Sequence, residues 1–304
     1  MNVHHELTRE STRPLVLAIG FFDGFHRGHR ELARRALRLR RPGWRCGLLT
    51  FENHPATHLR PGSEPDLLCT PQERLELFGR AGFEECFFVP FDERIATLSP
   101  DEFLQLLLEH LHVAAVVVGT TFRFGHKRTG DVAVMTEFLE RHGASAVAVS
   151  PVCDGGERIS STRIRTLVRD GELVRADELL GGTGYELRGP VEVGAGRGHA
   201  LGFPTANLRV PGKLLPKDGV YAATARYDGR DYAALVSIGS NPQFGGGERT
   251  VEAWLRDFQL TIYGRELALR DFRYLREQRL FAGVGELVKQ MQCDLQAIGY
   301  PSYG

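Results

Sequence analysis

Short apolar runs alternate with amphipathic segments along the first 180 residues of the chain. The apolar runs cover residues 14–20, 46–51, 86–91, 114–119 and 144–150. Between them, residues 29–40, 71–81, 100–111 and 131–142 have apolar side chains at helical spacing. Short bounded runs predict buried strands, and the spaced segments predict helices. Their alternation predicts an α/β domain with a doubly wound, Rossmann-like parallel sheet and helices on both faces.

The carboxyl ends of the predicted strands mark where a ligand should bind. In open parallel sheets, ligands occupy the crevice beyond these ends. Three stretches follow strands directly, at residues 19–30, 119–130 and 150–163. We therefore expect the chemistry of this domain to reside in these three stretches.

The pattern changes after two further predicted helices at residues 161–170 and 172–180. Beyond a Gly-rich linker, β-like runs occupy residues 185–193, 219–228, 230–239, 249–258 and 265–276. Gly-rich turns separate them, which favours a small antiparallel β-barrel. The tail at 283–298 has helical periodicity and is expected to pack on the barrel. The predicted fold is α/β plus β, with domains at residues 1–182 and 183–304.

Composition restricts the partners and the compartment. The 304 residues include 38 basic and 38 acidic side chains, and this zero net charge argues against broad binding to nucleic acid or a membrane surface. The N-terminus has no apolar signal region, and the apolar run 113–119 is too short to span a bilayer. Five scattered cysteines without a CxxC pair indicate free thiols. These features predict a cytoplasmic protein.

Residues 19–30 read IGFFDGFHRGHR and pose the first chemical question. Gly20 and Gly24 permit a tight turn after the first strand, and a helix is predicted to begin near His29. The first turn of a helix attracts anions through its unpaired N–H groups and its dipole. Gly28 allows a ligand to approach the backbone, and His26 and His29 would donate hydrogen bonds to phosphate oxygens.

Two other features bear on these histidines. A zinc site would need a further ligand, and His54 and His58 in FENHPATH match no zinc spacing. The segment RISSTRIR at 158–165 has hydroxyls that could simply cap a helix, or could cap it and bind phosphate together. Arg163 and Arg165 add positive charge. This second motif favours a phosphate site over an incidental HxxH.

The motifs GFFDGFHRGH and ISSTRIR resemble the HxGH and ISSTxxR signatures of the nucleotidylyltransferase superfamily. TFENHP and VGTTFRFGHKRTGD narrow the resemblance to the FMN adenylyltransferase module of bacterial FAD synthetases. The resemblance implies that these motifs bind the ATP phosphates and form the flavin site. The residues it places at the phosphates are His26, His29, Ser161, Thr162 and Arg163, within binding segments that include Gly20, Phe22, Asp23, Gly24 and Gly28. The residues it places at the flavin are Phe122, Phe124 and Gly125.

Two positions depart from the pattern of this family. Phe21 stands where Asn is common, and Thr121 stands where Asp or Asn is common. A lost amide or carboxylate there could weaken adenylyl transfer, while the phosphate motifs are intact.

A second group of candidates is in the C-terminal half. Thr205 and Asn207 in GFPTANL are two residues apart in extended chain, so their oxygens point the same way and suit Mg²⁺ bound to phosphates. Glu252 could accept the proton of an attacking hydroxyl, although a lone strand Glu is usually a solvated surface residue. The chain has no GxxxxGK[ST] motif, and GAGRGHALG at 194–202 lacks the dinucleotide-binding spacing.

The stretches LGFPTANL, LPKDGVYAA, SNPQFGGGERTVEAWL and YGRELALRDFRYLREQRLF together resemble the riboflavin kinase module. The resemblance implies a six-stranded barrel. It assigns Thr205 and Asn207 to Mg-ATP and Glu252 as the base toward the ribityl 5′-hydroxyl, with Gly202 and Pro204 in the binding segment. Gln243 departs from the family, which often has Thr there.

The two resemblances cover residues 15–299 in the motif order of bifunctional FAD synthetases. They imply phosphorylation of riboflavin to FMN and adenylylation of FMN to FAD, with ATP, Mg²⁺ and flavins as ligands. Three alternatives stay open. The first is a riboflavin kinase with a diverged N-terminal domain, motivated by Phe21 and Thr121. The others are a flavin- or nucleotide-binding regulator that touches nucleic acid, and an enzyme that adenylylates another phosphate-bearing acceptor.

Overall fold

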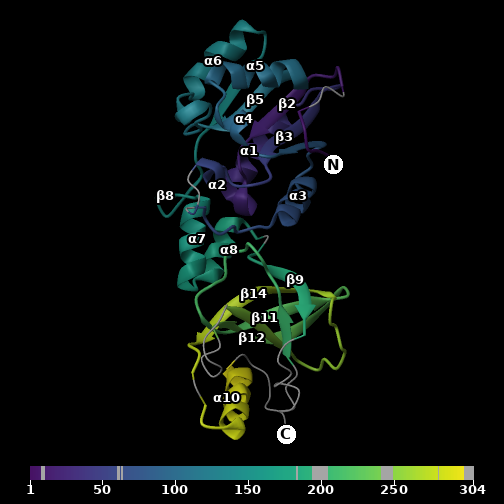
Figure 1. The fold of residues 1–304 in the computed structure, drawn as a ribbon, viewed down its shortest axis with the longest axis vertical. Coiled ribbons are helices and arrows are strands. Elements are labelled where there is room, and N and C mark those ends of the chain that lie inside the picture. Colours follow the sequence, from purple (N-terminus) through teal and green to yellow (C-terminus); the bar gives the residue numbers. More distant parts are fainter. Residues whose placement is uncertain are drawn as a thin grey trace. The chain divides into compact units, whose positions relative to one another are not determined.

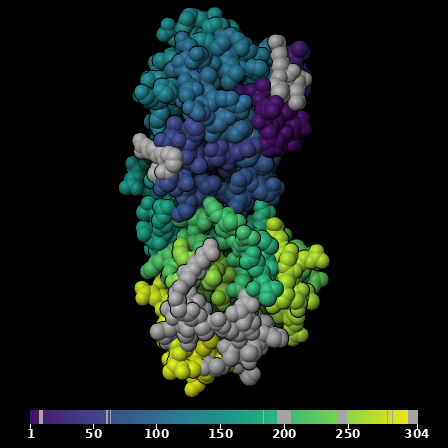
Figure 2. Space-filling model, in the orientation of Figure 1, coloured from purple at the N-terminus to yellow at the C-terminus, as the bar shows by residue number. Residues whose placement is uncertain are grey.

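The computed structural model describes residues 1–7, 11–59, 62, 64–182, 184–193, 205–240, 249–279 and 281–297. Contacts divide the chain into two compact units, Met1–Ser161 and Thr162–Gly304. Figure 1 shows the fold as a ribbon and labels many of its helices and strands. Figure 2 shows the side-chain surfaces, purple to teal for the N-terminal residues and green to yellow for the C-terminal ones.

The N-terminal unit is built on a six-stranded sheet in which all pairings are parallel. Its strands are β1 (Asn2–His4), β2 (Leu15–Ile19), β3 (Arg45–Phe51), β4 (Glu85–Val89), β5 (Val113–Gly119) and β6 (Ser145–Val149), in the order β1-β4-β3-β2-β5-β6. The five predicted strands and the doubly wound sheet are confirmed. The edge strand β1 was not predicted, because three residues with one apolar side chain make no recognisable run.

The connecting helices follow the predicted segments closely. They are α1 (Arg27–Leu39), α2 (Pro55–Leu59), α3 (Pro71–Arg80), α4 (Glu93–Ala96), α5 (Pro100–Leu111) and α6 (Val132–Arg141). Helices α3 and α5 each begin with a capping box and a proline in the first turn, which explains their sharp starts. The short helices α2 and α4 were missed, because four or five residues show no helical period.

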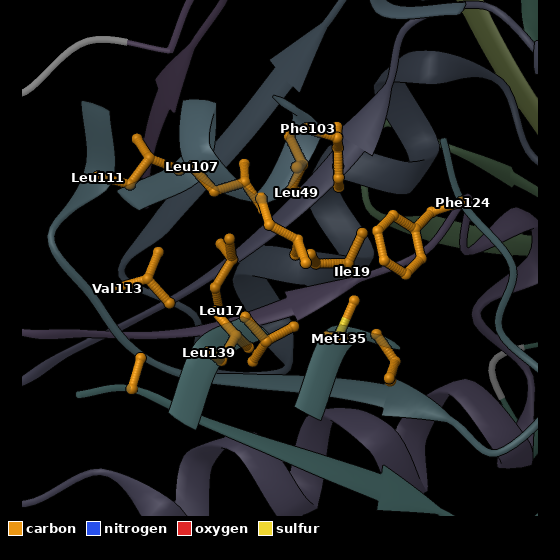
Figure 3. Close-up of a cluster of buried hydrophobic side chains, with 14 of the residues drawn as sticks. Leu17, Ile19, Leu49, Phe103, Leu107, Leu111, Val113, Phe124, Met135 and Leu139 are labelled. Atoms are coloured by element: carbon orange, nitrogen blue, oxygen red, sulfur yellow. The ribbon is translucent and has the colours of Figure 1, made fainter. Parts of the chain in front are cut away.

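Strand β2 shows why the predicted strands read as continuous apolar runs. Leu15, Leu17 and Ile19 pack into a cluster with α5 and α6, part of which is drawn in Figure 3. Val16 and Ala18 point to the opposite face and pack with α1 and α3. Because side chains alternate across a strand, helices on both faces of the sheet bury every residue of β2.

The C-terminal unit contains a closed six-stranded barrel in which neighbouring strands are antiparallel. The helices α7 (Ser161–Asp170) and α8 (Leu173–Leu180) precede it. The strands β9 (Leu187–Glu192), β10 (Thr205–Leu208), β11 (Gly219–Tyr227), β12 (Arg230–Gly239), β13 (Thr250–Leu255) and β14 (Glu266–Arg276) close in the order β10-β13-β12-β11-β14-β9. The helix α10 (Val284–Ala297) follows.

The barrel and its terminal helix confirm the predicted architecture. Leu295 of α10 packs on Leu235 and Trp254 of the barrel, as the periodicity of the tail predicted. The strand absent from the predicted β-runs is β10, whose TANL sequence is too short and too polar to form a recognisable run.

Candidate active sites

The order of the parallel strands reverses between β2 and β5. After β2 the chain builds β3 and β4 on one side, and β5 and β6 extend the sheet on the other. The connections that leave β2 and β5 therefore diverge, and a crevice between such connections is where open sheets bind ligands. The connection after β2 contains the HxGH motif, and the one after β5 contains FRFG.

The two motif histidines form a stacked pair at the start of α1. Their ring centroids are 3.6 Å apart with an interplanar angle of 17°. His26 is the N-cap of α1, and its Nδ1 accepts the backbone N–H of His29 at 3.3 Å. Because Nδ1 is an acceptor, neutral His26 has its proton on Nε2. That leaves Nε2–H as the group able to donate to an anion.

His29 is held in its neutral form. Burial, followed by the positive fields of His26 and Arg158, lowers the pKa of His29 well below 6.5. Its Nδ1 is buried and has no hydrogen-bond partner among the described residues. The edge of its ring contacts Phe22, with centroids 5.3 Å apart. An anion beside this pair would supply both the missing partner and a favourable charge.

Gly28 allows the stacked arrangement. A Cβ atom at this position would lie 3.1 Å from Cε1 and 3.2 Å from Nδ1 of His26. The same position is 3.8 Å from the carbonyl oxygen of Ile159, so the first residue of ISSTR lies beside the start of α1. Ser161 then donates its hydroxyl to the carbonyl oxygen of Asp23 at 2.9 Å. The structure thus brings the beginning of ISSTR to the HxGH turn.

Asp23 and Phe22, two predicted binding residues in the turn before α1, have buried side chains. Asp23 is 1% exposed, and its carboxylate accepts the N–H groups of Leu68 and Cys69, each at 3.0 Å. Phe22 is 2% exposed, and its ring packs edge-on against that of Phe78. These contacts of Asp23 and Phe22 anchor the turn between β2 and α1 to neighbouring segments.

Thr121, one of the two departures, contacts an arginine that sequence reasoning did not place. Arg158 donates from Nη1 to Thr121 Oγ1 at 2.9 Å. Arg158 belongs to the hairpin of β7 (Cys153–Asp154) and β8 (Glu157–Arg158), and Arg27 of α1 binds Asp154 of this hairpin at 2.8 Å. The only signal in the sequence was its place two residues before the ISSTR serines.

The three flavin candidates differ in their surroundings. Phe124 is 6% exposed and lies in the core cluster, beside Ile19 in Figure 3. Phe122 is half-buried and stacks on Phe124 at 5.8 Å and 16°. Gly125 has φ +72°, and a Cβ there would be 2.8 Å from the nitrogen of Pro100. Phe122 is therefore the more accessible of the two rings.

The kinase candidates come together through strand register. In the antiparallel pair of β10 and β13, Asn207 lies directly opposite Glu252, and Thr205 lies opposite Trp254. Opposed residues share a face of the sheet, and so do residues two apart on one strand. Thr205, Asn207 and Glu252 therefore share one face, although 44 residues lie between Asn207 and Glu252 in the sequence.

This face is the outer surface of the barrel. Val251 and Ala253, which flank Glu252, are 1% and 0% exposed and belong to the barrel interior. Glu252 and Trp254 point the other way, and α10 packs over Trp254. The candidate kinase residues thus lie on the side of the barrel that α10 covers in part.

A polar pair beside Glu252 was not predicted. Ser237 of β12 lies opposite Glu252, on the side away from Asn207. Gln278, which follows β14, donates its amide to Ser237 Oγ at 2.8 Å. Neither residue stands out in the sequence, because only the folded barrel brings them close to Glu252.

The remaining candidates lie either in the first turn of α7 or outside the described residues. Thr162 and Arg163 follow Ser161 in the first turn of α7. Gly202, Pro204 and the departure Gln243 lie outside the described residues. No helix in the described parts of the chain is long and apolar enough to cross a membrane.

Two family models match the sequence in consecutive segments. A model described as FAD synthetase matches residues 8–163, and one described as riboflavin kinase matches residues 181–299. These segments contain the histidine stack and the Asn207–Glu252 pair respectively.

Relatives match nearly the whole chain. Bifunctional riboflavin kinase/FMN adenylyltransferase from Listeria monocytogenes is 33% identical, over 97% of this chain and 95% of its own. The protein with the same name from Bacillus subtilis is 32% identical, with the same coverage of both chains. A crystal structure described as a macrolide-efflux protein from Streptococcus pneumoniae superposes with a TM-score of 0.87 at 30% identity, covering 97% of each chain.

Proposed function

The chain belongs to the family of bifunctional riboflavin kinases/FMN adenylyltransferases, and on this premise we propose how its residues perform the two reactions. The enzyme phosphorylates riboflavin to FMN with ATP, and it adenylylates FMN to FAD with release of pyrophosphate. We place the functional boundary between residues 182 and 183. The segments matched by the two family models, 8–163 and 181–299, support a boundary in this region.

In adenylyl transfer, the HxGH and ISSTR motifs bind the ATP phosphates. A phosphate oxygen of FMN attacks the α-phosphorus of ATP, the bond to the β-phosphate oxygen breaks, and pyrophosphate leaves. FMN phosphate is already anionic near neutral pH, so the step needs no general base. His26 Nε2–H, the neutral His29 and the N–H groups of α1 are oriented toward the charge that builds up on the phosphates. Ser161, Thr162 and Arg163 supply further donors.

The flavin of FMN lies against the segment that follows β5. Phe122 offers its half-buried ring to the flavin, and Phe124 holds Phe122 from the core side. Gly125 permits the turn that follows these rings. Phe122 thus contacts the flavin, and Phe124 supports Phe122.

In the kinase reaction, Glu252 accepts the proton of the ribityl 5′-hydroxyl as that oxygen attacks the γ-phosphorus of ATP, and ADP leaves. Thr205 and Asn207 fit a Mg²⁺ site, since their hard oxygen donors share one face with Glu252. Mg²⁺ neutralises part of the triphosphate charge when bound. Gly202 and Pro204 belong to the binding segment that leads into β10.

The direct pairing of Asn207 with Glu252 is the observation that best supports this assignment. The test is an incubation with ATP and Mg²⁺ in which flavins are separated over time. With riboflavin as substrate, E252Q should form no FMN, yet it should convert supplied FMN to FAD. H26A should accumulate FMN without FAD, with the adenylylation rate reduced by about 10²–10³-fold. The matched control is E266Q, which changes an exposed glutamate on β14 and should leave both rates unchanged.

Loss of both reactions in either variant, with the fold retained, would contradict the separation of the two sites. Formation of FMN by E252Q at the wild-type rate would remove Glu252 from the role of base. FAD formation by H26A at the wild-type rate would remove His26 from the phosphate site.

We also propose that the enzyme acts in the cytoplasm, without nucleic acid or membrane partners. The zero net charge and the five free cysteines support this proposal. A gel-shift assay with duplex DNA and RNA at physiological salt tests whether the enzyme binds nucleic acid. A retarded band would favour a regulator that also binds nucleic acid.

A further inference from the structure

A fully buried arginine lies beneath the HxGH turn. Arg74 is on α3, and it is 0% exposed. Burial lowers its pKa to about 10, with Asp23 as the largest opposing charge, so the side chain is cationic at neutral pH. Buried arginines are rare unless their charge and donors are used.

The guanidinium of Arg74 binds the backbone at the ends of two neighbouring strands. Nη1 donates to the carbonyl oxygen of Phe21, the second residue after β2, at 3.3 Å. Nη2 donates to the carbonyl oxygen of Phe51, the last residue of β3. The guanidinium carbon lies 4.3 Å from the ring centroid of Phe21 and 4.9 Å from that of Phe88. One side chain thus links the strand end that leads into the HxGH turn with the strand end that begins the TFENHP motif.

A second link joins the HxGH turn to the segment before α3, and here the turn supplies the acceptor. Asp23, two residues after Phe21, accepts the N–H groups of Leu68 and Cys69, which precede α3. Thr50 adds a donor to the Phe21 carbonyl at 3.0 Å. The turn is therefore held at two points. Arg74 of α3 donates to the carbonyl of Phe21, and two residues later the carboxylate of Asp23 accepts backbone N–H groups.

Arg74 has no exposed surface, so it does not contact substrate, and the groups it binds are the ones through which it would position the site. We propose that Arg74 is a positioning residue for adenylyl transfer. It fixes the carbonyls of Phe21 and Phe51, and thereby the turn that presents the His26–His29 stack. This inference rests on the proposed assignment of that stack to the ATP phosphates.

Replacement of Arg74 has distinct consequences for each substitute. Methionine fills much of the volume but leaves the Phe51 carbonyl without its donor and Phe21 with Thr50 alone. Lysine keeps the charge opposite Asp23, but a single ammonium lacks the fork that reaches two carbonyls. Displacement of reacting groups by about 1 Å costs up to about 100-fold in rate.

The test compares R74M and R74K with R80M, which makes the same change at an exposed arginine on the same helix. We expect R74M to lower kcat for FMN adenylylation by about 10- to 100-fold, with KM for ATP within about threefold of wild type. R74K should lie between wild type and R74M, and R80M should match wild type. Riboflavin phosphorylation by the same preparations should be unchanged, and it reports that the rest of the chain is folded.

Thr50 provides a test that does not depend on losing the buried charge. T50V removes the other donor to the Phe21 carbonyl and should reduce kcat for adenylylation by a smaller factor. In the R74K/T50V double variant the two effects should be non-additive, because both act on one carbonyl.

If R74K and R74M adenylylate FMN with the kcat of the wild type, at a temperature where both are folded, the proposal is overturned. Equal losses of both reactions, which indicate a general effect on folding, would also overturn it. H26A is measured in parallel. If H26A loses adenylylation while the Arg74 variants keep it, only the role of Arg74 fails; if H26A keeps it, the phosphate assignment fails.

Discussion

The two candidate sites are built on different structural principles. The adenylylation residues described in the N-terminal unit lie on turns beyond parallel strands, and buried side chains such as Asp23 and Arg74 hold these turns. The kinase residues lie on strands, where barrel register alone places Asn207 opposite Glu252. A loop site depends on remote anchors, whereas a strand site depends on pairing. Mutations away from substrate should therefore damage the first site more than the second.

The largest effect is expected at Gly28, where an added methyl group would lie close to the His26 ring. G28A places a methyl group 3.1 Å from the His26 ring, so the stack must shift. We expect FMN adenylylation to fall by about 100-fold, with riboflavin phosphorylation unchanged. Steady-state rates of both reactions in one preparation provide the measurement.

The matched control for G28A is G79A, since a Cβ at Gly79 of α3 meets no atom within 4 Å. Alanine in that helix should keep both rates and slightly raise the melting temperature. Equal rates for G28A and wild type would show that close packing of the stack is unimportant.

A smaller effect is expected at the strand site. S237A removes the oxygen that accepts the Gln278 amide beside Glu252. The loss of one such hydrogen bond, about 1 kcal/mol, should lower kcat for riboflavin phosphorylation several-fold and leave adenylylation unchanged. Q278L should give a similar loss, and the double variant should lose little more. Full additivity would mean that the two side chains act separately.

An effect on stability alone is expected at Asp177 of α8, which is not among the candidate site residues. Burial, with a contribution from Asp271, raises the pKa of Asp177 to about 6, although its carboxylate accepts the N–H of Tyr185. The folded unit then binds this proton more tightly than the unfolded chain, so stability falls as pH rises from about 4 to 6. D177N keeps an acceptor without the charge and should gain about 1 kcal/mol at pH 7, a value reduced for solvent screening of a half-buried group.

Urea unfolding of the wild type and D177N at several pH values measures this effect. The difference between the two proteins should be small near pH 4 and reach its full size above about pH 6. A difference that does not change with pH would contradict the raised pKa.

The smallest effect is a pH dependence at His29. Its lowered pKa means that the unfolded chain takes up a proton below about pH 6.5 while the folded unit does not. This group therefore stabilises the fold fully above pH 6.5, and its contribution decreases as the pH falls toward the folded pKa. NMR titration of the His29 ring, without ligand, should show no protonation near pH 6.5. A midpoint there would remove the argument for a neutral ring.

The sequence determined more of the fold than of the contacts at the sites. Five parallel strands, the long helices and most barrel strands were predictable, because buried strands need apolar runs and helices need periodic ones. The missed strands and α-helices, β1, α2, α4, β7, β8 and β10, are short or polar. The candidate site residues were also proposed from the sequence, because phosphate and Mg²⁺ chemistry needs particular groups at particular spacings, and their roles stay predictions.

Tertiary structure alone decided how those groups are held. It buried Asp23 and Phe124, which sequence reasoning placed among the binding residues, and it brought Arg158 to Thr121. It also placed Arg74 beneath the turn, 53 residues from its acceptor Phe21. Local sequence encodes propensity and spacing over a few residues, whereas burial and strand register depend on contacts between distant segments. These contacts exist only after the chain has folded.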